Sequence, residues 1–159
     1  MESESLYVFG NKLIHFIENN SPEKLIIDLR NNTGGNSSFL DPFIDDLKKC
    51  KNINETGKLF IIIGRDTFSS GLINAYSLKN TTNAILVGEP SGGKPNCYGE
   101  VKRFTLKHSG LVVSYSTEYY KIIDDDLMPS LLPDVECELS MKNYLSNEDP
   151  CLNYIFNYK

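Results

Sequence analysis

The sequence has few of the residues on which several common kinds of active site depend. It has only two histidines, His15 in a helical pattern and His108 in a hairpin-turn pattern, so a histidine-activated serine is poorly supported. The four cysteines are far apart, with no C-x-x-C pair and no histidine pair beside them. This spacing argues against a structural zinc site and leaves the disulfide state open, with unpaired thiols as the default. We therefore expect neither a metal ion nor a cofactor.

Long apolar runs and basic clusters are also missing. The longest apolar runs have the length of a β-strand, so we expect no membrane-spanning segment and no signal peptide. A net charge of −5 without a basic cluster gives no general attraction for nucleic acid or anionic lipid. The sequence thus predicts no nucleic-acid partner and no direct contact with a membrane.

The overall composition is that of one soluble globular domain. Hydrophobic residues make up 40% and charged residues 23% of the 159 positions, and this length is sufficient for one sizeable core. We expect a single domain over residues 1–159. Helical sequence begins almost directly after Met1, which suggests a fragment of a longer protein. In that case the missing signal says nothing about where the protein resides.

Strand and helix patterns alternate in the first half of the chain. Apolar runs typical of strands cover 25–29, 59–63 and 84–87; helical patterns cover 6–19, a segment capped by Ser37 or Ser38, and 69–79. Three successive strand–loop–helix steps predict an α/β fold with a mainly parallel sheet. Towards the C-terminus, alternation over 98–106 and 111–116 predicts a β-hairpin, followed by a short strand at 135–139. Two short helices are predicted after the caps Ser140 and Asp149.

Two loops contain residues that could take part in catalysis. The segment RDTFSSGL (65–72) follows an apolar strand and begins a helix at Ser69, a place where reactive serines often lie. The segment GEPSGGK (88–94) follows the next strand and ends at Lys94. Taken alone, Ser69 is also explained as a helix N-cap and Lys94 as a solvated surface lysine. The functional interpretation is that the two side chains meet in the fold.

A third loop, RNNTGGN (30–36), contains two adjacent glycines that suit positive φ angles and expose backbone N–H groups. A plain turn between strand and helix is the alternative. In a parallel sheet, however, the loops 30–36, 64–69 and 88–96 all leave the same edge, where ligands of such folds bind. This shared edge favours a joint site.

Together the three loops contain the parts of a Ser–Lys acyl-transfer site. A serine hydroxyl is a poor nucleophile until a base takes its proton. A lysine can be that base when burial destabilises its ammonium form. The oxyanion formed by attack on a carbonyl needs hydrogen-bond donors. The backbone N–H of Ser70 and that of Gly34 or Gly35 are available.

These segments resemble a known family. LIIDLRNNTGG (25–35), TFS (67–69) and VGEPSGGK (87–94) are similar to the oxyanion loop, nucleophile motif and lysine loop of carboxyl-terminal processing (tail-specific) serine peptidases. The 25-residue step from Ser69 to Lys94 is that family's usual spacing, and the likeness covers roughly residues 24–139. It implies a ClpP/crotonase-like spiral of ββα units and hydrolysis of polypeptides near their C-termini. Ser69 would be the nucleophile, Lys94 the base, and Gly34 or Gly35 with Ser70 the oxyanion hole.

The sequence also departs from the family pattern. Leu72 stands where many members carry a glutamate that orients the lysine, so that group must come from elsewhere, with Asn74, Glu89 and Ser116 as candidates. The PDZ domain and N-terminal segment of the family are absent, as in an excised catalytic core.

These departures keep an alternative open, a catalytically impaired peptide-binding or scaffold domain of the same fold. Phosphate or acyl-CoA binding is weaker, because Pro95 follows Lys94 and no P-loop pattern is present. The resemblance implies a bacterial parent protein that is extracytoplasmic or membrane-anchored, and leaves a homo-oligomer open.

Overall fold

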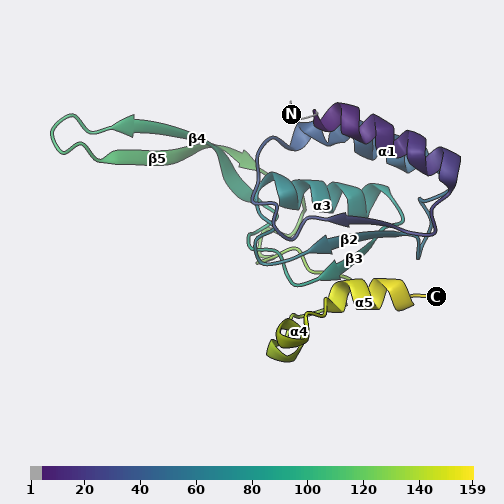
Figure 1. Ribbon diagram of the computed structural model, residues 1–159. Coiled ribbons are helices and arrows are strands. Elements are labelled where there is room, and N and C mark those ends of the chain that lie inside the picture. Colours follow the sequence, from purple (N-terminus) through teal and green to yellow (C-terminus); the bar gives the residue numbers. More distant parts are fainter. Residues whose placement is uncertain (1–4) are drawn as a thin grey trace.

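The computed structural model describes residues 5–159 and has a mixed α/β architecture (Figure 1). Its helices are α1 (Leu6–Asn20), α2 (Asp41–Lys49), α3 (Ser70–Thr81), α4 (Met141–Ser146) and α5 (Pro150–Asn157), with a 3-10 turn at Ser37–Phe39. Its strands are β1 (Leu25–Asp28), β2 (Leu59–Ile63), β3 (Ile85–Gly88), β4 (Cys97–Thr105), β5 (Val112–Tyr120) and β6 (Val135–Glu136). The predicted parallel sheet and hairpin are both confirmed.

The main sheet is parallel, with strand order β1-β2-β3-β6. Strand β2 is central, and all five of its residues are buried. A continuous apolar run is what a parallel strand covered on both faces requires. The three loops that follow β1, β2 and β3 therefore leave one edge of the sheet.

Helices cover both faces of this sheet (Figure 1). The side chains of β2 alternate between two cores, as the pleat of a strand dictates. Ile61 and Ile63 pack in the core that contains residues of α1, α2 and α3. Phe60 and Ile62 pack with Cys151 and Ile155 of α5 on the other face. Packing of helices on both faces of the sheet places the start of α3 beside the end of β2.

The helix caps are largely as predicted. Ser140 caps α4 through the N–H of Asn143, and Asp149 caps α5. The cap predicted at Ser37 or Ser38 is wrong for α2, which begins at Asp41. Pro42 suits the first turn of a helix because it needs no N–H acceptor there, whereas the residues before it form the 3-10 turn.

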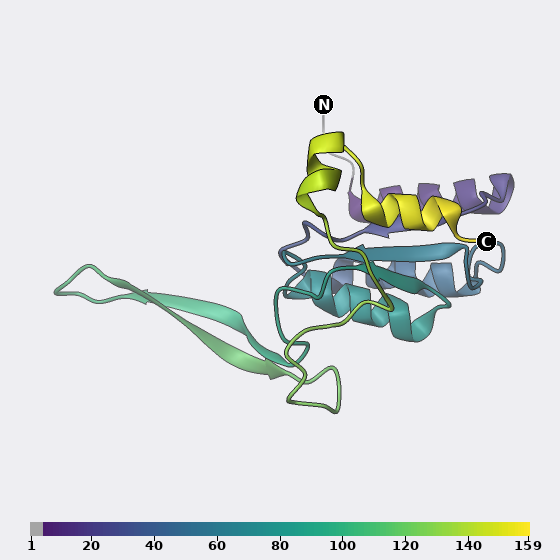
Figure 2. The ribbon, with the colours of Figure 1, turned by 90° about the horizontal axis from the view of Figure 1, so that it is seen from below.

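Strands β4 and β5 form a long antiparallel hairpin that projects away from the body (Figures 1 and 2). Tyr98 packs against Tyr119 with ring centroids 4.9 Å apart, and Phe104 packs against Tyr115 at 6.0 Å. Only the base of the hairpin joins the body. Within residues 5–159, no helix is long and apolar enough to cross a membrane.

Candidate active site

Thr67 joins the loop after β1 to the loop after β2. Its side chain is fully buried, and its hydroxyl donates a hydrogen bond to the carbonyl of Leu29 at 2.8 Å. The same hydroxyl accepts a hydrogen bond from the N–H of Gly64 at 2.9 Å. A buried hydroxyl that satisfies groups on both loops fixes their spacing.

Backbone hydrogen bonds bring the third loop to the same place. The N–H of Phe68 donates to the carbonyl of Asn32 at 3.0 Å, and the N–H of Gly92 donates to the carbonyl of Thr67 at 3.0 Å. A Cβ atom on Gly92 would collide with the backbone carbonyl oxygen of Arg65, so only glycine allows this approach. All three loops thus meet at the two residues that precede Ser69.

Ser69 has a strained backbone. Its φ of 52° and ψ of −122° lie in a region that residues other than glycine rarely adopt, at a cost of roughly 1–3 kcal/mol. It occupies the N-cap position of α3, but its side chain makes no capping hydrogen bond. The helix-cap interpretation of this serine is therefore not supported. A tight turn between a strand and a helix is instead the geometry that exposes the nucleophile of many hydrolases.

Glycine is required opposite Ser69. Gly34 has a φ of 127°, and a Cβ atom there would lie 2.8 Å from Cβ and 3.3 Å from Oγ of Ser69. Any side chain at position 34 would collide with the serine. The loop backbone consequently lies in direct reach of the Ser69 hydroxyl.

Two backbone donors near Ser69 are available. Within residues 5–159, the N–H groups of Gly35 and Ser70 have no hydrogen-bond acceptor, while the N–H of Gly34 donates to Oδ1 of Asn32 at 3.1 Å. Gly35, Ser69 and Ser70 line one cavity of about 440 Å³. Of the two glycines that the sequence offers, Gly35 is the one whose N–H has no acceptor among the described residues.

Lys94 lies on an ordered loop but its side chain is exposed. Ser91 anchors this loop, since its Oγ accepts from the N–H of Leu131 at 2.8 Å and its N–H donates to the Leu131 carbonyl at 3.0 Å. Among residues 5–159, no hydrogen bond or ion pair joins Lys94 to Ser69 or to any other group. The structure brings the lysine loop to the serine without joining the two side chains.

The three candidates for orienting the lysine lie in different surroundings. Asn74 is buried in α3, and its Oδ1 has no partner in the described part of the chain. Glu89 forms an ion pair with Arg65 at 2.8 Å, and Ser116 lies exposed on β5. Leu72 is buried in the core at 2% exposure. Of the three candidates, Asn74 is the one whose side-chain oxygen is buried without a hydrogen-bond partner in the described part of the chain.

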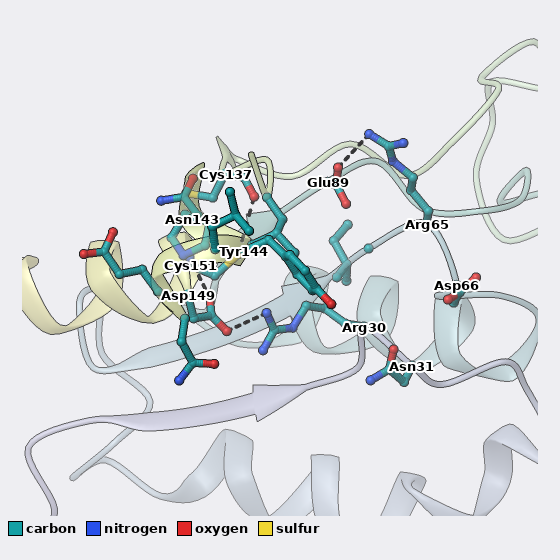
Figure 3. Close-up of a pocket in the computed structure, with 17 residues that line it drawn as sticks. Arg30, Asn31, Arg65, Asp66, Glu89, Cys137, Asn143, Tyr144, Asp149 and Cys151 are labelled. Carbon is teal, nitrogen blue, oxygen red and sulfur yellow. Dashed lines mark hydrogen bonds and ion pairs between the residues drawn. The ribbon is translucent and has the colours of Figure 1, made fainter. Parts of the chain in front are cut away.

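A separate cavity of about 790 Å³ lies beside α4 and the start of α5 (Figure 3). Arg30 lines it and forms ion pairs with Asp149 at 2.7 Å and with Asp28 at 2.6 Å. Burial acts to raise the pKa of Asp28, but the hydrogen bonds from Arg30 outweigh it and lower that pKa. Ser69 does not line this cavity. Among the described residues, no cluster of three histidine, cysteine, aspartate or glutamate side chains could hold a metal ion.

The sequence did not reveal that the base of the hairpin forms one wall of the Ser69 cavity. Tyr98, Glu100 and Tyr120 line it together with Ser70 and Ile73 of α3. Alternation predicted the hairpin itself, but which residues face Ser69 depends on the direction in which the hairpin leaves the body. No local pattern carries that information.

Comparison with known proteins places the chain in a family. The sequence profile of peptidase family S41 matches residues 41–136, which include the loops of Ser69 and Lys94. The chain therefore belongs to peptidase family S41, as its motifs predicted. No curated protein sequence matches it significantly.

Solved structures share its fold at low identity. A protein assigned to the S41 proteases from Bacteroides fragilis has a TM-score of 0.61 and 14% identity over 99% of this chain and 48% of that one. A lipoprotein from Streptococcus agalactiae has a TM-score of 0.52 and 21% identity over 92% and 61%. The photosystem II D1 C-terminal processing protease has a TM-score of 0.54 and 16% identity over 86% and 40%. The chain thus spans about half the length of these proteins.

Proposed function

We propose that this chain is the core of a serine-type endopeptidase that hydrolyses polypeptides near their C-termini through a Ser69–Lys94 acyl-enzyme mechanism. Membership of family S41 supports peptidase activity in general. The observation that carries the proposal is the strained Ser69, whose hydroxyl makes no capping bond and faces the oxyanion loop. Strain of this kind persists where surrounding structure imposes it, and it clusters at active sites.

In this mechanism Lys94 turns from solvent towards Ser69 when substrate fills the cavity and excludes water. A dry environment favours the neutral amine, which takes the proton from Oγ as this atom attacks the scissile carbonyl. The N–H groups of Gly35 and Ser70 donate to the resulting oxyanion. Lys94 then gives the proton to the leaving amine, and a water molecule hydrolyses the acyl-enzyme by the same route. Asn74 is the candidate that we favour for orienting the lysine, ahead of Glu89 and Ser116.

A second function is supported by a specific observation. Lys94 is exposed and Leu72 occupies the usual orienting position, a combination that also fits a peptide-binding domain with impaired catalysis. Such a domain would bind the same polypeptides without turnover. Retention of both Ser69 and Lys94 favours the enzyme.

The wider proposal concerns the protein to which the chain belongs. We infer a ClpP/crotonase-like spiral of ββα units, one catalytic domain over residues 1–159, and a polypeptide substrate as its main partner. The lipoprotein with a similar fold fits an extracytoplasmic or membrane-anchored parent protein in a bacterium. Homo-oligomer formation is a further expectation that sedimentation can test.

The test is a comparison of Ser69→Ala and Lys94→Ala with matched controls. Unstructured peptides are incubated with each protein, and mass spectrometry maps the cleaved bonds. We expect both variants to lose cleavage by roughly 10³-fold or more, while Ser77→Ala, later in α3, and Lys51→Ala, on an exposed turn, retain it. Cleavage that persists in Ser69→Ala would refute the mechanism. Peptide binding without cleavage by the unmodified protein would favour the second function.

A further inference from the structure

The cavity at Ser69 is lined by one charged residue. Gly35, Ser69 and Ser70 line it, and so do residues at the base of the hairpin. Among the described residues that line it, Glu100 is the only one with a charged side chain. A bound polypeptide would therefore meet a carboxylate close to the bond that Ser69 attacks.

The backbone of Glu100 is held in an unusual conformation. Its neighbours Gly99 and Val101 pair regularly with Glu118 and Ser116, but Glu100 itself has a φ of 50° and forms no ladder pair. Its carbonyl instead accepts a hydrogen bond from the hydroxyl of Thr117 at 2.8 Å. A positive φ at a glutamate is uncommon and is maintained here by the surrounding hairpin.

The side chain of Glu100 is exposed and is held by a hydrogen bond from a neighbouring residue. The hydroxyl of Tyr120, another residue of the cavity wall, donates to Oε1 of Glu100 at 2.7 Å. This hydrogen bond, with burial adding to it, raises the pKa of Tyr120 to about 12, as expected beside an ionised carboxylate. One carboxylate oxygen is thus engaged by Tyr120, and the other can accept a further donor.

We propose that Glu100 is a specificity-determining residue that binds a lysine or arginine side chain of the substrate next to the scissile bond. This inference rests on the proposed function and names its substrate class. A carboxylate positioned before binding loses little freedom when it pairs with a cation. The rings of Phe68 and Tyr98, which line the same cavity, suit the aliphatic stem of such a side chain. The same carboxylate repels an acidic residue at that position.

Tyr120 acts through Glu100 and is a positioning residue. Tyr120→Phe removes the hydroxyl and leaves the ring, so the cavity wall stays in place while the carboxylate gains freedom. The preference for a cationic substrate then weakens but does not vanish. This intermediate response distinguishes positioning from a role in packing alone.

The experiment uses peptides that differ only beside the scissile bond. Lysine, norleucine or glutamate is placed at each of the two flanking positions, because norleucine retains the lysine stem without its charge. We expect the unmodified protein to have the highest kcat/KM for lysine and the lowest for glutamate. In Glu100→Gln, the lysine-to-norleucine ratio of kcat/KM falls about fivefold, the range of a solvent-accessible ion pair. Glu100→Lys reverses the order so that glutamate is preferred to lysine.

Glu118→Gln is the matched control, because Glu118 lies on the facing strand, is exposed and does not line the cavity. Its lysine-to-norleucine ratio should equal that of the unmodified protein. An unchanged ratio in Glu100→Gln would overturn the inference. So would an equal loss for all three peptides, which would assign Glu100 to the chemical step. Labelling of Ser69 by a phosphonate probe distinguishes failure of this inference from failure of the proposed function. If Ser69 is labelled but the protein shows no charge preference, this inference alone is overturned. If the folded protein is not labelled, the proposed function is overturned and this inference with it.

Discussion

Thr67→Val is the substitution that most directly tests how the three loops are held together. The two side chains have nearly the same shape, so the change removes the hydroxyl without creating a large cavity. The N–H of Gly64 then has no acceptor in a fully buried position, and the Leu29 carbonyl keeps only the bond from Asn32. An orphaned buried donor costs about 1–3 kcal/mol and a lost hydrogen bond about 1 kcal/mol. We therefore expect the free energy of unfolding to fall by about 2–4 kcal/mol.

Thermal unfolding followed by circular dichroism measures this loss. For a chain of this size each kcal/mol lowers Tm by about 2–4 °C, so the expected decrease is about 5–15 °C. Thr67→Ser keeps the hydroxyl and should lose much less stability. Thr81→Val removes an exposed hydroxyl that donates to the Ser77 carbonyl at 2.7 Å, and should stay within about 0.5 kcal/mol of the unmodified protein. A Thr67→Val protein as stable as Thr81→Val would refute this account of the loops.

Three further predictions follow from single residues. Ser69→Gly should abolish acylation yet raise the free energy of unfolding by about 1 kcal/mol, measured in urea, because glycine tolerates the positive φ; a loss of stability would contradict the strain. The pKa of Tyr120, followed by ultraviolet absorbance, should be about 12, and Glu100→Gln should lower it. Because the pKa of tyrosine in the unfolded chain is ~10, the free energy of unfolding should fall as pH rises from ~10 through about 12. Burial raises the pKa of Cys151 to about 12, so iodoacetamide at mildly alkaline pH should modify Cys151 only after unfolding.

Much of the fold could be predicted because its signals are local. The run at 59–63 matches β2 residue for residue, since a strand covered on both faces needs unbroken apolar sequence. The caps at Ser140 and Asp149 could also be predicted from the sequence, because capping depends on residues only a few positions away. The convergence of three loops followed from the parallel order of the strands.

The remaining features depend on contacts between distant segments. No pattern indicates the φ of Ser69, which is imposed by Gly34 and by the hydrogen bonds of Thr67 and Phe68. The base of the hairpin at Glu100 could not be assigned to the Ser69 cavity for the same reason. Leu72 stands where the resemblance implies a glutamate, but sequence alone did not rank the possible replacements. The buried oxygen of Asn74, which has no partner in the described part of the chain, distinguishes that residue from the others.

The measurement that tests the central claim most directly is covalent labelling of Ser69 itself. The unmodified protein, Lys94→Ala and the control Lys51→Ala are treated with a fluorophosphonate probe, which phosphonylates a reactive serine with loss of fluoride, and peptide mass spectrometry locates the adduct. We predict a single adduct at Ser69 in the unmodified and control proteins, with a rate that rises with pH as a neutral base becomes available, and loss of this adduct in Lys94→Ala. A folded protein with no adduct at Ser69, or an adduct formed equally fast without Lys94, would contradict the Ser69–Lys94 site.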